Sequence, residues 1–289
     1  MNDRYVDLHT HSTASDGTLA PSEVVRLAAA QGLSAIALTD HDTVAGVAEA
    51  TSAALSFGLD FLPGIEISAE FPQPGTLHIL GYGIDPESPD LKNLTETLLA
   101  GRDNRNPKIV AKLQELGMQI TMAEVEAEAK GGVIGRPHIA AILVRKGYAN
   151  SMADAFKYYL APGGSAYFDK ERLSPRTAIE MIRKAGGLAV LAHPSQLRTT
   201  NDAELERVIK DLIDLGLAGI EVLHSDHTDR QVEQYTKLAD RYGVLKTGGS
   251  DFHGSNKPTI PLGQAGGRRV PRAFYDGLVR ALEQGRGYK

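Results

Sequence analysis

Residues 4–12, RYVDLHTHS, place two histidines at the end of a short apolar segment. Residues 4–8 have the composition and alternation of a β-strand, and His9 and His11 follow directly. Because alternate residues of an extended chain point to the same side, we expect the two imidazoles to lie on one face. The stretch therefore predicts a strand that presents polar, chemically active side chains at its carboxyl end.

The rest of the chain repeats this unit of strand and helix. The predicted strands cover residues 4–8, 35–38, 61–67, 77–82, 188–191, 219–223 and 244–247, and the predicted helices cover residues 21–31, 44–57, 175–185, 203–215, 228–242 and 271–284. Strands that alternate with helices are typical of a parallel sheet. An open doubly wound sheet would also fit, but seven strands in 289 residues favour a closed or distorted α/β barrel.

Residues 85–170 lack strand patterns and predict a helical insertion. Helical patterns cover residues 91–99, 108–116, 122–128, 139–145 and 152–160. We therefore expect two domains, a barrel of residues 1–84 and 171–289 and a helical insertion of residues 85–170. The insertion is expected to cover the active site of the barrel.

Histidines and carboxylates accompany most of the predicted strands. His41 follows the second strand in the run TDHD, and His193 follows the fifth in the run LAHP. The candidate ligands are His9, His11, Asp16, His41, Glu66, His78, His193, Asp251 and His253. Since the carboxyl ends of barrel strands form the active face of such folds, we expect these side chains to converge there.

Nine such side chains on one face predict a metal cluster. Any one of them could be an unrelated polar loop residue, but packing them together is costly unless cations compensate. The set exceeds the four ligands of one tetrahedral zinc ion, so we expect two or three divalent metals with Glu66 as a bridge. The chain has no cysteine. Mn²⁺ is the preferred ion, with Zn²⁺ or Fe²⁺ as alternatives.

The motifs resemble those of the PHP (polymerase and histidinol phosphatase) superfamily. The matching runs are DLHTHS at 7–12, TDHD at 39–42, GIEIS at 64–68, LHILGYG at 77–83, LAHP at 191–194 and GGSDFHG at 248–254. The run GRPHIA at 135–140 resembles the TrpH/YciV branch, whose members act as 3′,5′-nucleoside bisphosphate phosphatases or trim short RNA from its 5′ end. The resemblance implies a distorted (β/α)₇ barrel of the PHP type with a helical insertion.

The resemblance also implies how the ligands divide among three metals. It assigns His9, His11, Glu66 and Asp251 to the first metal, Glu66, His78 and His193 to the second, and Asp16, His41 and His253 to the third. Glu66, Asp251 and His193 would hold a metal-bound water that attacks the phosphate. His227, in the loop after the sixth predicted strand, is the candidate general acid.

The insertion carries the residues expected to bind the substrate. Arg136 and His138 flank Pro137 at a predicted helix start, where free N–H groups and the helix dipole favour an anion. Arginine can also grip a phosphate through two parallel hydrogen bonds. Lys170 and Arg102 are further candidate phosphate ligands, and Arg105 is another cation in the same segment.

These observations predict a metal-dependent phosphoric monoester hydrolase. As the resemblance implies, with Arg136 available to hold the 5′-phosphate, it would remove the 3′-phosphate of nucleoside 3′,5′-bisphosphates, so that the adenine substrate yields AMP and phosphate. The alternatives are a 5′-to-3′ exoribonuclease acting on short RNA, an amidohydrolase-type C–N hydrolase, and a non-catalytic domain of the kind associated with polymerases. The amidohydrolase reading is weakened because Glu66 stands where such barrels often carry a carboxylated lysine bridge.

Charge and hydropathy limit the partners. The net charge of −5 argues against binding of long nucleic acid, so a small nucleotide or a short RNA end is expected. No apolar run approaches the roughly 20 residues of a membrane span, and residues 1–5 lack the apolar core of a signal peptide. These features predict a cytoplasmic protein without a membrane partner.

Overall fold

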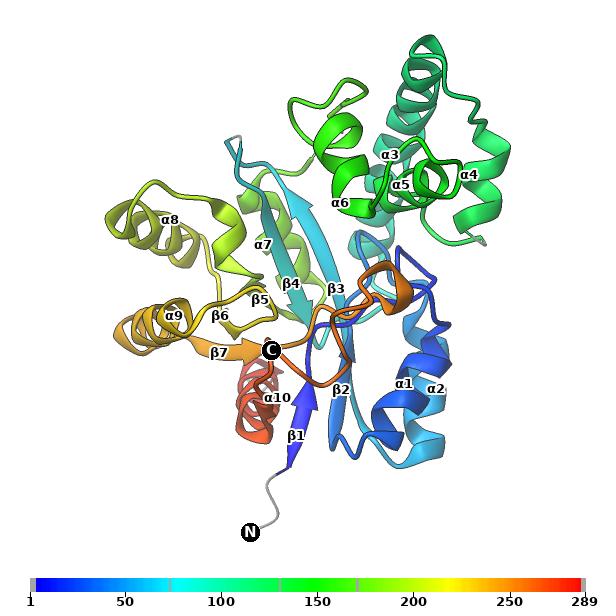
Figure 1. Cartoon of the computed structure of the whole chain (residues 1–289). Coiled ribbons are helices and arrows are strands. Elements are labelled where there is room, and N and C mark those ends of the chain that lie inside the picture. The colour runs from blue at the N-terminus through cyan, green and yellow to red at the C-terminus, as the bar shows by residue number, and fades with distance from the viewer. Residues whose placement is uncertain (1–3, 73, 130, 170–171, 287–289) are drawn as a thin grey trace.

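The computed structural model describes residues 4–72, 74–129, 131–169 and 172–286. Its strands form one sheet in the order β7-β6-β5-β4-β3-β2-β1-β8, which curls into a nearly closed barrel (Figure 1). The strands are β1 Tyr5–Asp7, β2 Ala35–Leu38, β3 Asp60–Ala69, β4 Leu77–Tyr82, β5 Leu188–Leu191, β6 Gly219–Leu223, β7 Leu245–Gly248 and β8 Val270–Pro271. The predicted distorted α/β barrel is therefore confirmed.

The expectation of a parallel sheet is wrong for β4. This strand pairs antiparallel with both β3 and β5. The connection from β3 to β4 spans only residues 70–76, which suffices for a hairpin but is too short for the crossover that a parallel pair needs. As a result the first residues of β4 lie beside the last residues of β3, where His78 is the register partner of Ser68.

Hydrogen bonds beyond the end of β1 join it to β7 and close the barrel on one side. Leu8 N donates to Gly248 O at 3.2 Å, and Asp251 N donates to His9 O at 2.9 Å. Nearer its start, on the edge opposite β2, β1 pairs antiparallel with β8, a strand of two residues that has no recognisable sequence pattern. Closure brings the histidines after β1 next to the loop after β7.

The close approach of Gly249 to His9 leads to a testable prediction about the closure of the barrel. A Cβ at position 249 would lie 2.3 Å from His9 Cβ and 2.4 Å from His9 N, inside a buried seam that cannot shift freely. We expect Gly249→Ala to lower the free energy of unfolding by about 2–4 kcal/mol in urea denaturation. Gly285→Ala is the control, because a Cβ there meets nothing within 4 Å and alanine favours helix α10. Equal stability of both variants would contradict the seam's tight packing.

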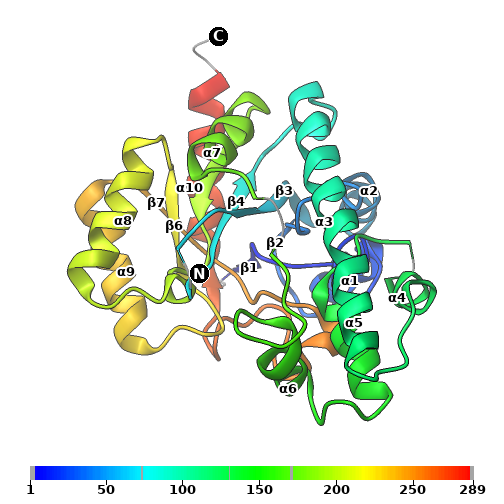
Figure 2. The same ribbon diagram turned by 90° about the horizontal axis from the view of Figure 1, so that it is seen from above.

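Helices cover the outside of the barrel (Figures 1 and 2). They are α1 Pro21–Ala30, α2 Val47–Phe57, α7 Pro175–Lys184, α8 Asp202–Asp214, α9 Asp229–Tyr242 and α10 Arg272–Arg286, with short 3₁₀ turns at Pro194–Leu197 and Gly254–Asn256. Their apolar faces meet the strands in a core that includes Ile65, Ile79 and Val190, and the buried Tyr82 hydroxyl donates to Leu8 O at 2.8 Å. In the described part of the chain, no helix has both the length and the hydropathy needed to span a membrane.

The insertion helices gather beside the β3–β4 hairpin (Figure 1). They are α3 Pro89–Glu115, α4 Met122–Ala129, α5 Arg136–Arg145 and α6 Met152–Ala155, followed by a π-helix at Phe156–Leu160. The prediction of two helices at 91–99 and 108–116 is wrong, because one helix of 27 residues runs through Pro107. Its polar middle lacks an apolar repeat but carries Arg102 and Arg105, which are buried against neighbouring segments.

Helix α3 links two hydrophobic cores. Leu91, Leu94 and Leu98 in its first half belong to the core of the barrel. Ile109 and Leu113 in its second half belong to a separate core of the insertion, with residues of α4 and α5. The packing boundary between the two cores therefore falls inside α3. The expected division into a barrel of residues 1–84 and 171–289 and an insertion of residues 85–170 remains a prediction.

Candidate active site

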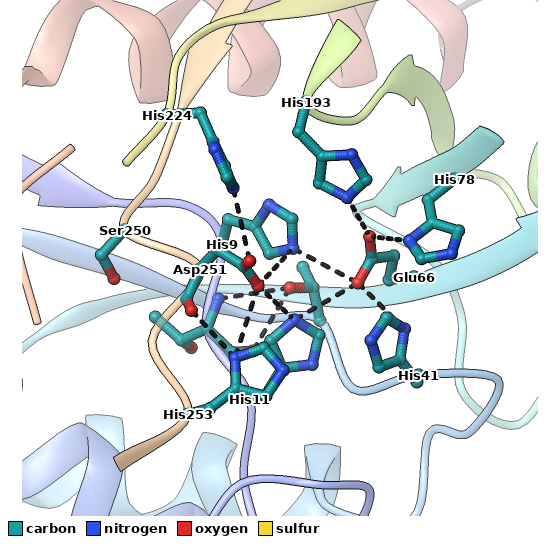
Figure 3. A network of polar contacts seen from close by, with 12 residues as sticks. His9, His11, His41, Glu66, His78, His193, His224, Ser250, Asp251 and His253 are labelled. Carbon is teal, nitrogen blue, oxygen red and sulfur yellow. Dashed lines mark hydrogen bonds and ion pairs between the residues drawn. The ribbon is translucent and has the colours of Figure 1, made fainter. Parts of the chain in front are cut away.

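All of the candidate ligands gather at one end of the barrel (Figure 3). They comprise six histidines and three carboxylates: His9, His11, Asp16, His41, Glu66, His78, His193, Asp251 and His253. Most follow the carboxyl ends of parallel strands, as expected for a barrel. His78 comes from the start of β4, and the reversed direction of that strand brings it to the same end.

Glu66 lies at the centre of the cluster and is fully buried. Its Oε1 is 2.9 Å from His78 Nδ1 and 3.0 Å from His193 Nε2. Its Oε2 lies 3.3 Å from His9 Nε2, 3.3 Å from His11 Nε2 and 3.0 Å from His41 Nδ1. Burial opposes ionisation of this carboxyl, but the surrounding imidazoles, His41 foremost, hold the pKa of Glu66 well below its usual range. The two oxygens thus face different histidines, which suits a carboxylate that bridges two ions.

The other carboxylates organise the opposite side of the cluster. Asp251 Oδ1 is 3.2 Å from His11 Nε2, and Asp16 Oδ1 is 3.2 Å from His253 Nε2. The potential ligand atoms of His11, Asp16, His41 and His253 all lie within 4.8 Å of one another. Carboxylate and imidazole ligands at this spacing suit Mn²⁺, Fe²⁺ or Zn²⁺.

The unpaired polar atoms of the cluster fit this interpretation. Five buried atoms of the cluster have no hydrogen-bond partner among the described residues: His9 Nε2, His11 Nδ1, His11 Nε2, His41 Nδ1 and Glu66 Oε2. A buried polar atom that lacks a partner costs free energy, and a divalent ion would satisfy such atoms. The donor set therefore fits a metal centre.

Two of the ligands have a backbone conformation that residues other than glycine rarely adopt. The φ angle is +58° at Asp251 and +25° at His193. Hydrogen bonds hold both residues in place, from Asp251 N to His9 O at 2.9 Å and from His193 N to Glu221 Oε2 at 2.7 Å. Such strain concentrates at functional sites, where the surrounding structure must maintain it.

The sequence interpretation missed Glu221 and His224, both contributed by β6 and its end. Glu221 Oε1 accepts a hydrogen bond from His9 Nδ1 at 2.9 Å, and its Oε2 accepts from His193 N. A carboxylate that accepts a hydrogen bond from the second ring nitrogen of a metal-ligating histidine orients that histidine. His224 directly follows β6, as other ligands follow their strands, so the sequence did contain a signal for it.

His224 faces a ligand rather than the centre of the cluster. Its Nδ1 accepts a hydrogen bond from Asp226 N at 3.0 Å, so the proton of the neutral imidazole is on Nε2. That Nε2 lies 3.4 Å from Asp251 Oδ2 (Figure 3). His224 therefore supports the orientation of Asp251.

His227 occupies a position that does not suit a general acid. It is buried behind His224, with a ring-to-ring distance of 5.2 Å, and packs on Tyr235 at 4.8 Å. Its Nδ1 lies 3.1 Å from Val222 O. Burial, reinforced by His224, lowers the pKa of His227 to about 4, so the ring is neutral at pH 7. Its geometry indicates a packing role.

A cavity of about 170 Å³ adjoins the candidate metal ligands and carries a concentration of positive charge. It is lined by the candidate ligands Asp16, His41 and His78, by the arginines Arg102, Arg105, Arg136 and Arg172, and by apolar residues that include Phe71 and Phe156. The arginines come from α3, from the start of α5 and from the segment before α7. The insertion thus supplies most of the charge beside the barrel's cluster.

Among the described residues, Arg102 and Arg172 pair with the carboxylates of Asp42 and Asp169, whereas Arg105 and Arg136 donate to neutral groups. Arg102 Nη2 donates to Asp42 Oδ2 at 2.5 Å, whereas Arg105 Nη2 donates to the neutral amide of Asn106 at 2.9 Å. Arg136 Nη1 donates to the backbone oxygen of Leu160 at 2.9 Å. Burial, together with the neighbouring guanidinium groups, lowers the pKa of Arg105 to about 9. Such crowding of cations favours the binding of an anion.

The other predicted substrate ligands have different positions. His138 does not line the arginine cavity, because residues two apart on a helix point to nearly opposite sides. Its Nδ1 accepts from Gly135 N at 3.0 Å, and it lines a second cavity of about 400 Å³ with Thr18 and Asn256. Pairing of His138 with Arg136 at one phosphate is therefore wrong. Lys170 lies outside the described residues.

Comparisons with known proteins place this chain in one family. The model of the PHP domain family matches residues 7–216. A 5′-3′ exoribonuclease of Haemophilus influenzae is 38% identical over 88% of this chain and 91% of its own. A 3′,5′-nucleoside bisphosphate phosphatase of Chromobacterium violaceum is 37% identical over 86% of this chain and 87% of its own. A solved structure from Bifidobacterium adolescentis, described as a metal-dependent phosphoesterase, superposes with a TM-score of 0.87 at 32% identity and covers 96% of each chain.

Proposed function

This chain belongs to the PHP domain family, and from that premise we propose that its metal-dependent phosphoesterase site removes the 3′-phosphate of nucleoside 3′,5′-bisphosphates. The products would be a nucleoside 5′-monophosphate and phosphate. The relative from Chromobacterium violaceum, named for this substrate, supports the proposal. So does the similarity to a metal-dependent phosphoesterase over nearly the whole chain.

The observation that carries the proposal is that the candidate metal centre and the cluster of arginines line the same cavity. Asp16, His41 and His78 of the candidate metal centre line the same cavity as Arg105 and Arg136. A phosphate at the metal centre and a second phosphate at the arginines would therefore belong to one small molecule. A substrate with a single phosphate at the metal centre would place no anion beside Arg105 and Arg136, which donate to the neutral oxygens of Asn106 and Leu160.

Each part of the site has a separate task in this proposal. Divalent ions bound by the cluster would activate water near neutral pH and offset the charge of the reacting phosphate. Glu66 and Asp251 supply negative charge that holds those ions, and Glu221 orients His9. Arg105 and Arg136 hold the phosphate that is not cleaved, so that binding energy at a distance positions the scissile ester.

The cavity also has an apolar side for the nucleoside. Phe71 comes from the β3–β4 hairpin and Phe156 begins the π-helix of the insertion, and both line the cavity. Bases stack on aromatic rings with little dependence on their sequence. The partner that we propose is a small nucleotide or the end of a short RNA, without long nucleic acid or membrane.

A second candidate function is trimming of short RNA from the 5′ end. The relative from Haemophilus influenzae, which has similar identity to this chain, is named for that activity. An arginine cavity that binds a 5′-phosphate while the neighbouring 3′-ester reacts would serve both substrates. The two functions differ only in what is attached to the far side of the scissile phosphate.

Measuring phosphate and nucleotide products in the presence of Mn²⁺ tests the proposed function. The substrates are adenosine 3′,5′-bisphosphate, AMP, p-nitrophenyl phosphate and a short 5′-phosphorylated RNA. We expect adenosine 3′,5′-bisphosphate to be converted to 5′-AMP with the highest kcat/KM. Chromatography that shows the 3′-monophosphate as product would contradict the assignment of the two phosphates. A higher kcat/KM for the RNA would favour the second candidate.

A further inference from the structure

Asp251 has two oxygens with different neighbours. Its Oδ1 faces the imidazoles of the cluster, at 3.2 Å from His11 Nε2 and 3.5 Å from His9 Nε2. Its Oδ2 is 2.5 Å from Lys257 Nζ, and His224 lies on the same side at 3.4 Å. A lysine thus pairs with a carboxylate that is itself a candidate metal ligand.

The loop that carries Lys257 is tied to the site. A 3₁₀ turn of residues Gly254–Asn256 immediately precedes the lysine. Ser255 N donates to Thr18 Oγ1 at 2.9 Å, and Asn256 Nδ2 donates to Asp16 O at 2.8 Å. These bonds hold the turn against the loop of another candidate ligand, so the position of Lys257 depends on the same two loops that present Asp16 and Asp251.

The ion pair between Lys257 and Asp251 differs from the other ion pairs of the cluster. Asp16 and Glu66 form their ion pairs with histidines, whereas Asp251 also pairs with a lysine. Among the described residues, Lys257 is the one lysine or arginine in an ion pair with a carboxylate of the cluster. Its side chain is 38% exposed, so solvent screens its charge only in part.

We propose that Lys257 is a built-in counter-cation of the metal centre, which weakens the binding of a divalent ion at His9, His11 and Asp251. This inference rests on the metal centre of the proposed function. A fixed ammonium beside Asp251 repels a second cation that uses the same carboxylate, and it offsets the negative charge of the cluster when no ion is bound. Removing a residue that lies among the ligands would then tighten metal binding, which is the opposite of what loss of a ligand does.

The test compares Lys257→Met with the wild-type chain, both treated with chelator and titrated with Mn²⁺ alone. Methionine keeps the length and apolar stem of lysine and removes the charge. We expect the dissociation constant of the tightest Mn²⁺ site, measured by calorimetry or chelator competition, to fall about tenfold. We also expect the melting temperature of the chelator-treated protein to fall by about 2–4 °C, because the carboxylates lose a counter-charge.

Matched variants separate charge from shape. Lys257→Arg keeps the positive charge and should leave Mn²⁺ affinity unchanged, and Lys257→Gln should reproduce the effect of Lys257→Met. Lys237→Met removes a lysine that pairs with Glu233 on the surface of α9, and it should change neither measurement.

The possible outcomes discriminate between this inference and the proposed function. Unchanged Mn²⁺ affinity in Lys257→Met and Lys257→Gln would overturn the inference, and weaker binding would show instead that the lysine holds Asp251 in a ligating position. A wild-type chain that binds no Mn²⁺, Fe²⁺ or Zn²⁺ would contradict the metal centre itself and with it the proposed function.

Discussion

Glu66→Ala is expected to abolish phosphoesterase activity, with kcat/KM reduced by roughly three orders of magnitude or more. The carboxylate is fully buried, and its two oxygens face five imidazoles within 3.3 Å. A bridging ligand contributes to more than one ion, so its loss should lower metal content by at least one ion per chain. Elemental analysis and phosphate release with adenosine 3′,5′-bisphosphate provide the two measurements.

Glu70, a nearby carboxylate at the start of the connection between β3 and β4, serves as the control for this prediction. Glu70 follows the end of β3 and is exposed, so Glu70→Ala should retain both metal content and activity. Circular dichroism establishes whether Glu66→Ala remains folded. A folded Glu66→Ala protein with full metal content and wild-type activity would exclude Glu66 from the metal centre.

Arg136→Ala is expected to lower kcat/KM for adenosine 3′,5′-bisphosphate. The loss of transition-state stabilisation should be about 2–5 kcal/mol, the range that is typical of losing a buried charged contact. Arg136 lines the cavity beside His41 and His78. In the proposed function it binds the phosphate that does not react. p-Nitrophenyl phosphate has no second phosphate, so its kcat/KM should change little, and metal content should stay the same.

Arg145→Ala is the matched control at the other end of helix α5. This arginine is 55% exposed and pairs with Glu128, away from the arginine cavity. Its loss should affect neither substrate. Equal losses of kcat/KM on both substrates in Arg136→Ala would mean that Arg136 acts on the reacting phosphate or on the fold, and the assignment of two phosphate subsites would be wrong.

Spacing along the chain, together with the family motifs, was enough to identify nine candidate members of the cluster, although it missed Glu221 and His224. His9 and His11 follow β1, His41 follows β2 and His193 follows β5, each within four residues of the strand end. The reason is physical, because the carboxyl ends of parallel strands meet at one end of a barrel. A histidine or carboxylate at such a position therefore has neighbours of the same kind.

The helical insertion was harder to predict in detail. Gly101 and Pro107 interrupt the apolar repeat of residues 91–116, which suggested two helices, yet α3 continues through both positions. Burial of Arg102 against Asp42 and of Arg105 beside Asn106 supports the polar middle of this helix. The contact between Arg102 and Asp42 joins segments 60 residues apart in the sequence, so a local pattern does not reveal it.

The sequence by itself determined the order of strands and helices, the barrel class and the candidate ligands, because strand and helix periods and strand ends are local properties. The short connection before β4 already required its reversal, but only the tertiary structure decided the closure of β1 against β7 and the separation of His138 from Arg136. It alone also revealed the pairing of Glu221 with His9 and of Lys257 with Asp251. Each of these depends on the direction of a strand or helix face, or on packing between segments, and the free energy that selects them comes from contacts formed only when the barrel closes.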